Sequence, residues 1–247
     1  MPKLFNVATN KQGLIVYGGE ASSDYGIVVG DAPSFDKPVR RAEVYNVQGR
    51  NGSILFQDGS FDDVTRSYNV WFAEDNGDLT DKTYALSGWL YSKKGYQRLE
   101  DSFEPDIFRL GYFNGSGEFT NNMMQYGEAT LSFVCRPERF FKSGEEPLTV
   151  TNGDKLNNPT RFDSKPLLHV EGSGTVTITI AGVTITITGL VDYINIDCDR
   201  MNAYRLETEN KNSMVSGTFP KLVPGSNTIA TTGTVSKLVI TPRYFVI

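Results

Sequence analysis

The sequence predicts a mainly β protein, and three features of the 247-residue chain support this fold class. Aromatic residues make up 12% of the chain and glycine contributes 24 residues, a composition that favours strands joined by tight turns. Short apolar runs bounded by Gly, Pro, Asn or Asp recur roughly every 8–12 residues, as they do in β-sandwiches. One segment stands out with the apolar spacing of a helix.

The first half of the chain predicts several strands and that one helix. Strands are expected in the apolar runs at 14–19, 26–31, 40–47, 54–56, 67–75, 106–113 and 123–135. Thr80 or Asp81 can cap the helix, and Gly95 can end it just after two lysines that suit the helix dipole. The apolar stripe of the helix, which would lie on a sheet, consists of Tyr84, Ala85, Leu86, Trp89 and Leu90.

Residues 172–191 carry no charge and predict a β-hairpin with a turn at Ala181 and Gly182. In this register, apolar residues face apolar residues and threonines face threonines, and a one-residue slip would mix the two faces. The expected apolar pairs are Ile180–Val183, Ile178–Ile185 and Val176–Ile187, and the threonine pairs are Thr179–Thr184, Thr177–Thr186 and Thr175–Thr188. Because Ala-Gly is not the preferred residue pair of a type I′ turn, a longer loop is the alternative to this two-residue turn.

Residues 136–166 differ from both flanking regions, since they hold four of the 11 prolines and two Gly-containing turns. We expect a linker or an ordered junction there. The predicted organisation is an N-terminal β domain with one helix at 1–140, a junction at 141–165 and a C-terminal β-sandwich at 166–247.

Charge and composition exclude several classes of function. The net charge of −5 argues against tight binding of nucleic acid and of anionic membrane surfaces. No apolar window suits a signal peptide or approaches the roughly 18 residues of a membrane-spanning helix. Cys135 and Cys198 are too few for a disulfide framework or a cysteine zinc site, so both are expected to be buried free thiols.

The sequence predicts no catalytic, cofactor-binding or metal-binding residue. His169 is the single histidine, so any serine or cysteine triad would have to use it, and a two-histidine metal site is excluded. We interpret His169 as an ordinary strand position. Neither of the two common phosphate-binding glycine motifs occurs, so the chain is expected not to be an enzyme and to need no cofactor.

Some residues could have a functional role, but we prefer a structural interpretation for each of them. Acidic pairs that could serve a glycosidase lie at 62–63, 145–146 and 197/199, but any acidic β protein offers such pairs. Residues 75–81 lack the alternation of a calcium loop and suit a solvated turn. Trp71 and Trp89 could stack on sugar rings, although core packing is the preferred interpretation for both.

Four stretches resemble the distal tail protein family of siphovirus-type phages, and they occur in the order expected for that family. The first, GRNGSILFQDGSFDD, is similar to the Gly-Arg-Asp/Asn-Gly turn of the family, with Asn51 where Asp is more usual. The others are LSGWL with the following GYQRLEDSFEPDIFRLGYF, LSFVCRPERFF, and FPKLVPGSNTI with the terminal ITPRYF. Together these stretches span nearly the whole chain.

The resemblance implies a structural role in the tail tip or baseplate of a virion assembled in the bacterial cytoplasm. In the family, the N-terminal domain forms a ring, usually a hexamer, at the end of the tail tube. The C-terminal domain is a galectin-like β-sandwich that supports receptor-binding proteins and in some members contacts saccharides. The implied partners are further copies of the chain, the tail tube protein, a tail-tip or tail-associated protein and a receptor-binding protein.

Two other classes of function stay open from the residues alone. The C-terminal sandwich could be a carbohydrate-binding module, or the chain could be an enzyme such as a glycosidase. A ring protein should form oligomers, a carbohydrate-binding module should bind soluble sugars, and an enzyme should have a cleft with perturbed acids.

Overall fold

The computed structural model describes residues 13–34, 37–73, 80–115, 119–122, 126–206 and 208–247. The chain divides into unit 1, which comprises Met1–Arg139 and Ile247, and unit 2, which comprises Phe140–Val246. Among the described residues there is one α-helix, and most of the rest are strands. The predicted fold class, mainly β with one helix in the N-terminal part, is therefore confirmed.

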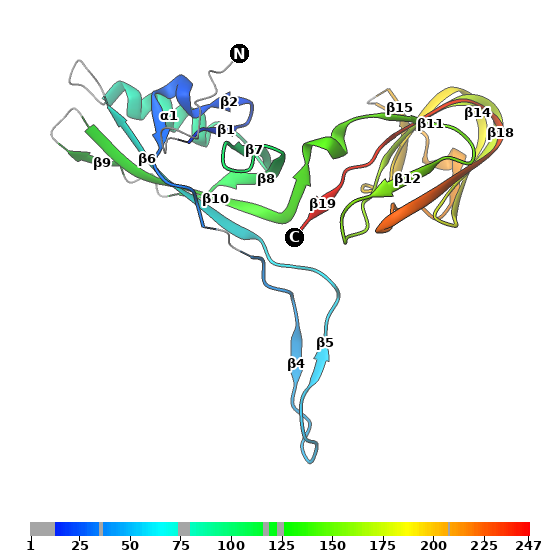
Figure 1. Cartoon of the computed structure of the whole chain (residues 1–247), viewed down its shortest axis with the longest axis horizontal. Coiled ribbons are helices and arrows are strands. Elements are labelled where there is room, and N and C mark those ends of the chain that lie inside the picture. The colour runs from blue at the N-terminus through cyan, green and yellow to red at the C-terminus, as the bar shows by residue number, and fades with distance from the viewer. Residues whose placement is uncertain (1–12, 35–36, 74–79, 116–118, 123–125, 207) are drawn as a thin grey trace. The chain divides into compact units, whose positions relative to one another are not determined.

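Unit 1 is built on an antiparallel sheet in the order β2-β1-β7-β8-β10-β6-β3, in which β9 also pairs with β10 (Figure 1). Its helices are η1 (Ser22–Tyr25, a 3₁₀ turn) and α1 (Thr80–Tyr91). The strands up to β10, which continues into unit 2, are β1 (Ile15–Tyr17), β2 (Glu20–Ala21), β3 (Ile27–Val29), β4 (Glu43–Tyr45), β5 (Ile54–Phe56), β6 (Val64–Ala73), β7 (Gln97–Asp101), β8 (Ile107–Phe113), β9 (Phe119–Asn122) and β10 (Tyr126–Phe141).

The sheet of unit 1 curls round until its ends meet. Gly13, just before β1, exchanges two backbone hydrogen bonds with Val29 of the last strand, at 2.7 and 3.2 Å. A Cβ atom at Gly13 would lie 2.3 Å from the Phe103 ring, so only glycine fits this close approach. This single bridge joins β3 to the residue that precedes β1 by two positions.

Helix α1 packs on the core of unit 1 through Leu86, Trp89 and Leu90, as expected. The Trp89 indole donates to the Tyr17 carbonyl at 3.0 Å, so core packing is confirmed for this tryptophan. Tyr84 and Ala85 were expected on the same stripe, but both side chains are exposed, Tyr84 by 71%, so that part of the prediction is wrong. The helix also ends at Tyr91, before Gly95. The predicted turn at 75–78 lies outside the described residues.

Unit 2 is an eight-stranded sheet in the order β11-β18-β13-β14-β15-β16, in which β12 also pairs with β18 and β17 with β14. Residues 141–165, predicted as a junction, contain two strands that pair with β18. The elements are η2 (Lys142–Glu145), β11 (Leu148–Val150), β12 (Lys155–Asn158), β13 (Leu167–Ile180), β14 (Val183–Asp197), β15 (Asn202–Arg205), β16 (Glu209–Asn210), η3 (Asn212–Met214), β17 (Val215–Gly217), β18 (Gly225–Thr241) and β19 (Phe245–Val246).

The hairpin β13–β14 has the predicted register near its turn. Ile180 pairs with Val183, Ile178 with Ile185 and Val176 with Ile187, and Thr179 and Thr177 face Thr184 and Thr186. Ala181 and Gly182 both take positive φ, so the two-residue turn forms. The expected Thr175–Thr188 pair is wrong, because a bulge between Gly174 and Val176 shifts the register.

The three longest strands within unit 2, β13, β14 and β18, have irregular register near their middles, where glycines allow close backbone approach. A Cβ atom at Gly172 would lie 2.2 Å from the Thr234 carbonyl oxygen, and one at Gly233 would lie 2.2 Å from that of Thr175. Each strand can therefore contribute to two walls around one core. That core includes Leu168, Val170, Val176, Ile178, Ile180, Ile185, Ile187, Ile194, Ile196, Ile229, Leu238 and Ile240.

Candidate functional site

A β-hairpin that belongs to neither large sheet is the candidate functional site. Its strands, β4 and β5, pair with each other, with Glu43 opposite Phe56, Val44 opposite Leu55 and Tyr45 opposite Ile54. Figure 1 draws them as a two-stranded ribbon separate from both sheets. We call residues 39–63 the arm.

Local interactions explain why these residues form a hairpin. Gly49 and Gly52 both have a φ of 80°, which a tight reversal of the chain needs. Ser53 Oγ donates to Asn46 Oδ1 at 2.6 Å across the hairpin. The rings of Tyr45 and Phe56 meet edge to face, with 5.9 Å between their centroids.

The arm exposes apolar side chains on both of its faces. Because side chains alternate along a strand, Tyr45 and Phe56 lie on one face and Val44 and Leu55 on the other. Phe56 is 63% exposed and Leu55 is 55% exposed. Six of the 13 large hydrophobic residues that are exposed in the described part of the chain belong to the arm: Val39, Val44, Tyr45, Val47, Leu55 and Phe56. Such a concentration marks an interaction surface.

Polar contacts hold the root of the arm. The Arg41 side chain meets the Asp62 carboxylate at 2.7 Å, and the Asp62 amide donates to the Val39 carbonyl at 2.9 Å. Arg40 lies over the Phe61 ring, 4.6 Å from its centroid. The Tyr96 hydroxyl, which lies outside the arm, donates to Asp63 at 3.0 Å. The arm therefore leaves unit 1 from a defined base.

A buried charge cluster lies where β6 continues from the arm. The Asp101 side chain, 0% exposed, accepts from Arg66 at 3.1 Å and from the Tyr68 hydroxyl at 2.8 Å. Its other oxygen accepts the backbone N–H groups of residues 103 and 104 at 3.0 and 2.9 Å. Burial is the largest cause that raises the pKa of Tyr68, and the negative charge of Asp101 raises it further. The Tyr68 hydroxyl therefore remains a donor.

Glu104 completes the cluster by joining three arginines. It contacts Arg66 at 3.3 Å, Arg139 at 3.4 Å, and Arg109. Arg66 also donates to the Ser34 carbonyl at 2.6 Å, which ties the chain entering the arm to the strand leaving it. The sequence alone does not reveal this cluster, because its members lie in four separate segments and form no local motif.

The structure places His169 on β13, as expected. Its Nδ1 atom lies 2.8 Å from Asn195 Oδ1, and its Nε2 atom lies 3.3 Å from Glu171. The two cysteines are buried free thiols, as predicted, and burial raises the pKa of Cys135 and of Cys198 to about 12. Both thiols therefore stay protonated and are poor nucleophiles at neutral pH.

Two of the three acidic pairs named from the sequence are engaged in structural contacts. Asp62 and Asp63 hold the root of the arm, as described above. Asp197 accepts from Arg243 at 2.8 and 3.1 Å, and Asp199 accepts from Lys165 at 2.9 Å. Glu145 ends η2 and Glu146 follows it. None of these contacts brings two of the named carboxylates together across a cleft.

No three His, Cys, Asp or Glu side chains among them are grouped as metal ligands would be. No helix among them is long and apolar enough to cross a membrane.

Neither a protein-family model nor a curated protein matches this sequence. Solved structures do match the fold. A crystal structure of the Dit protein of phage SPP1, described as a paradigm of the hub adsorption apparatus in phages that infect Gram-positive bacteria, superposes with a TM-score of 0.77. It is 12% identical, and the match covers 95% of this chain and 99% of that one.

A chain of the phage P2 baseplate, in its activated conformation with calcium, also matches. Its TM-score is 0.51 at 10% identity, and the match covers 93% of this chain and 97% of that one. The resemblance to distal tail proteins is thus confirmed in three dimensions: this chain has the fold of a phage Dit protein.

Proposed function

We propose that this chain is a structural protein of a phage tail tip or baseplate, which assembles into a ring, and that it is not an enzyme. The exposed arm is the observation that carries the proposal. A two-stranded hairpin alone is at best marginally stable in water, so one with apolar side chains on both faces suits burial against a partner. The likeness to the SPP1 Dit protein supports a hub as the assembly.

Other copies of the chain are the partners of the arm in this proposal. A head-to-tail contact, in which the arm of each subunit packs on the next, closes into a ring when the rotation between subunits permits. Six copies are expected from the resemblance. Because the net charge of −5 opposes close packing of copies, the contacts must be extensive and specific.

In this proposal each predicted domain has its own structural role. Residues 1–140 form the ring at the end of the tail tube, 141–165 make the junction, and 166–247 support tail-tip and receptor-binding proteins. The protein is located at the tail tip of the virion after assembly in the host cytoplasm. It binds no nucleic acid tightly and inserts into no membrane, which suits an acidic protein around a channel.

Charged substitutions in the arm test the ring. Native mass spectrometry over a range of protein concentrations, with and without the tail tube protein, should detect a closed oligomer for the wild type. Leu55→Asp should abolish it. Val191→Asp, at a 71% exposed apolar position of unit 2, is the matched control and should leave it intact. An oligomer that survives Leu55→Asp but not Val191→Asp would assign the ring contacts to unit 2.

A further inference from the structure

The Asn-Gly pairs of this chain differ in how firmly the fold holds them. In such a pair, the backbone nitrogen of glycine can attack the side-chain carbonyl carbon of asparagine, because glycine has no Cβ atom beside that nitrogen. The pairs begin at Asn51, Asn76, Asn114 and Asn152. Asn76 lies outside the described residues, and the segment after Asn114 leaves them at residue 116. Asn51 and Asn152 have described neighbours on both sides, so their surroundings can be compared.

The first pair, Asn51 and Gly52, lies at the tip of the arm in the loop that joins β4 to β5, and both residues are exposed. Hydrogen bonds from Arg50 and Ser53 hold the loop on either side of the pair. Among the described residues, neither the Asn51 side chain nor the Gly52 N–H has a hydrogen-bond partner. A Cβ atom at Gly52 would meet no atom within 4 Å, so this glycine lies in open space.

The second pair, Asn152 and Gly153, lies between β11 and β12 and is also exposed. Its glycine has a φ of 94°, similar to the 80° of Gly52. However, Asn152 Oδ1 accepts from the Thr231 amide at 2.9 Å, and the Gly153 amide donates to the Ile229 carbonyl at 2.8 Å. Both reacting groups of this pair are therefore held by β18.

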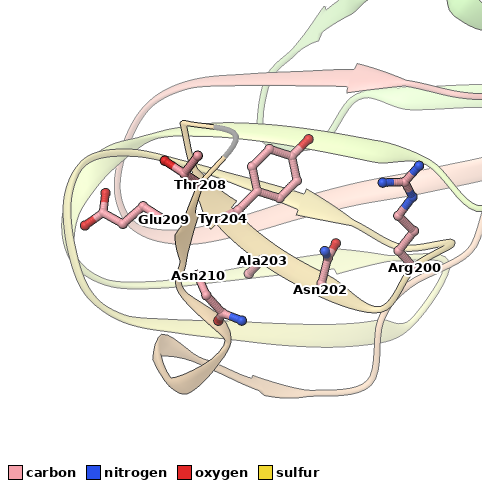
Figure 2. A pocket seen from close by; sticks show the side chains of 7 residues that line it. All are labelled: Arg200, Asn202, Ala203, Tyr204, Thr208, Glu209 and Asn210. Carbon is pink, nitrogen blue, oxygen red and sulfur yellow. The ribbon is translucent and has the colours of Figure 1, made fainter.

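Asn210 of β16 is a further example of an exposed asparagine that is held. Figure 2 shows its side chain among the residues that line a polar cavity of unit 2. Its Oδ1 atom accepts from the Asn212 amide at 2.8 Å, and the N–H of Lys211, the residue that follows, donates to the Ala203 carbonyl at 2.8 Å. Exposure to solvent alone therefore does not free the reacting groups of an asparagine in this chain.

The reaction open to the first pair is a loss of ammonia followed by hydrolysis. The Gly52 nitrogen forms a bond to the side-chain carbonyl carbon of Asn51, and the bond from that carbon to the amide nitrogen breaks. The proton of the Gly52 N–H leaves with this nitrogen as ammonia, and a five-membered cyclic imide remains. Water then opens the imide at either carbonyl, which gives aspartate or isoaspartate. One water is consumed and one ammonia is released, without an oxidant or reductant.

We propose that Asn51 is a site of spontaneous deamidation, with water as the co-reactant, and that the product alters the tip of the arm. Either product places a negative charge next to Arg50, where asparagine carries none. Isoaspartate also adds one carbon atom to the backbone of the loop between the paired strands β4 and β5. The proposal is independent of the ring, because the reaction needs only the subunit and water.

The hydrogen bonds around the second pair determine the expected difference in rate. They must break before Asn152 and Gly153 can react, and the net contribution of one hydrogen bond corresponds to a factor of about ten in rate. We therefore expect Asn51 to convert about tenfold faster than Asn152, or more, in the folded chain.

Peptide mass spectrometry on the full chain, sampled over time at physiological temperature and neutral pH, measures the conversion at each asparagine. Digestion in water enriched in heavy oxygen marks any conversion that occurs during sample preparation. Isoaspartyl methyltransferase, which methylates isoaspartate, identifies that product. A parallel incubation in concentrated urea removes the fold, so the two pairs should then convert at similar rates.

A substitution of the attacking residue separates this reaction from direct hydrolysis of the side chain. Gly52→Ala places a Cβ atom beside the attacking nitrogen and should slow the conversion of Asn51 by about tenfold or more. Gly59→Ala, at another arm glycine with a φ of 85° and no atom within 4 Å of an added Cβ, is the matched control. It should leave the rate at Asn51 unchanged.

Three results would each overturn the proposal. In the folded chain, Asn51 stays intact or converts no faster than Asn152. The difference between the two pairs persists in urea, which would assign it to the flanking residues instead of the fold. Gly52→Ala converts as fast as the wild type, which would mean that the Gly52 nitrogen is not the attacking atom.

Discussion

The two hairpins of this protein obey the same pairing rules but differ in what they bury. In β13–β14, Val176, Ile178 and Ile187 gather on one face and are fully buried, while threonines occupy the other. In the arm, Leu55 and Phe56 lie on opposite faces, and both are exposed. Pairing across strands therefore specifies a hairpin, but the separation of faces decides whether the hairpin can bury a face within its own subunit.

The two hairpins also differ in the contacts that hold each of them to the rest of its unit. The β13–β14 hairpin is held by β18 along most of its length. The arm depends on polar contacts at its root and on the buried charges of the strand that follows it. Substitutions should thus act on folding in one hairpin and on assembly in the other.

The largest loss of stability is expected from Asp101→Ala beside the root of the arm. It removes one of the two carboxylates that pair with the buried Arg66, and breaking such a buried pair typically costs roughly 3–5 kcal/mol. Urea unfolding followed by tryptophan fluorescence measures the effect, since Trp89 reports on unit 1. Asp192→Ala removes an exposed ion pair with Arg205 and should cost about 1 kcal/mol or less. Equal costs would mean that the cluster contributes no more than a surface ion pair.

Ile178→Ala tests the buried face of β13–β14. Removal of this side chain, which is 0% exposed, should cost roughly 2–5 kcal/mol. Thr177→Ala, on the opposite face, should cost about 1 kcal/mol or less, the usual contribution of one hydrogen bond. Chemical unfolding followed by circular dichroism compares the two variants. Small, equal effects would contradict the assignment of the faces.

Asp197 should make the stability of unit 2 depend on pH. Burial raises the pKa of its carboxyl, but hydrogen bonds from Arg243 and from the backbone of Arg200 and Asp199 outweigh burial and hold the pKa below its usual value. Because the folded pKa is lower than the unfolded one, the stabilisation is fully present above the unfolded pKa of about 4 and is lost as pH falls through the folded pKa.

The matched variant for this effect is Asp197→Asn. Its stability deficit should be constant near neutral pH and should shrink as the pH falls below about 4. Urea unfolding over a pH series measures the deficit. A deficit of the same size from about pH 7 to pH 2 would mean that the carboxylate charge is not what stabilises this corner.

The smallest effect on folding is expected from Phe56→Ala in the arm. This side chain is 63% exposed in the subunit, so the free energy of unfolding should change by about 0.5 kcal/mol or less. The same variant should weaken the oligomer, which sedimentation velocity over a concentration series can measure. A large loss of subunit stability without any loss of assembly would show that the arm packs on its own subunit.

The sequence predicted those parts of the fold whose signal is local. The register from Val176 to Ile187 followed from strict alternation, and Leu86, Trp89 and Leu90 followed from helical spacing. The error at Tyr84 arose because a tyrosine tolerates the exposed side of a helix. The bulge at Gly174 escaped notice because alternation alone does not reveal where a strand must bend.

The candidate functional site was harder to predict from the sequence than the fold. The turn glycines of the arm, Gly49 and Gly52, were visible, but an apolar run alone does not reveal that a hairpin has no sheet to cover it. The charge cluster unites Arg66, Asp101 and Arg139 only after the sheet has formed.

The way in which the chain enters and leaves unit 2 has an evolutionary consequence. The entering strand donates from the Phe141 amide to the Tyr244 carbonyl of the returning segment at 2.9 Å, and Ile247 then rejoins unit 1. The two ends of unit 2 are therefore adjacent. Recombination can exchange such a cassette for another domain without interrupting the closed sheet or the arm. A lineage could thus change unit 2 while keeping unit 1.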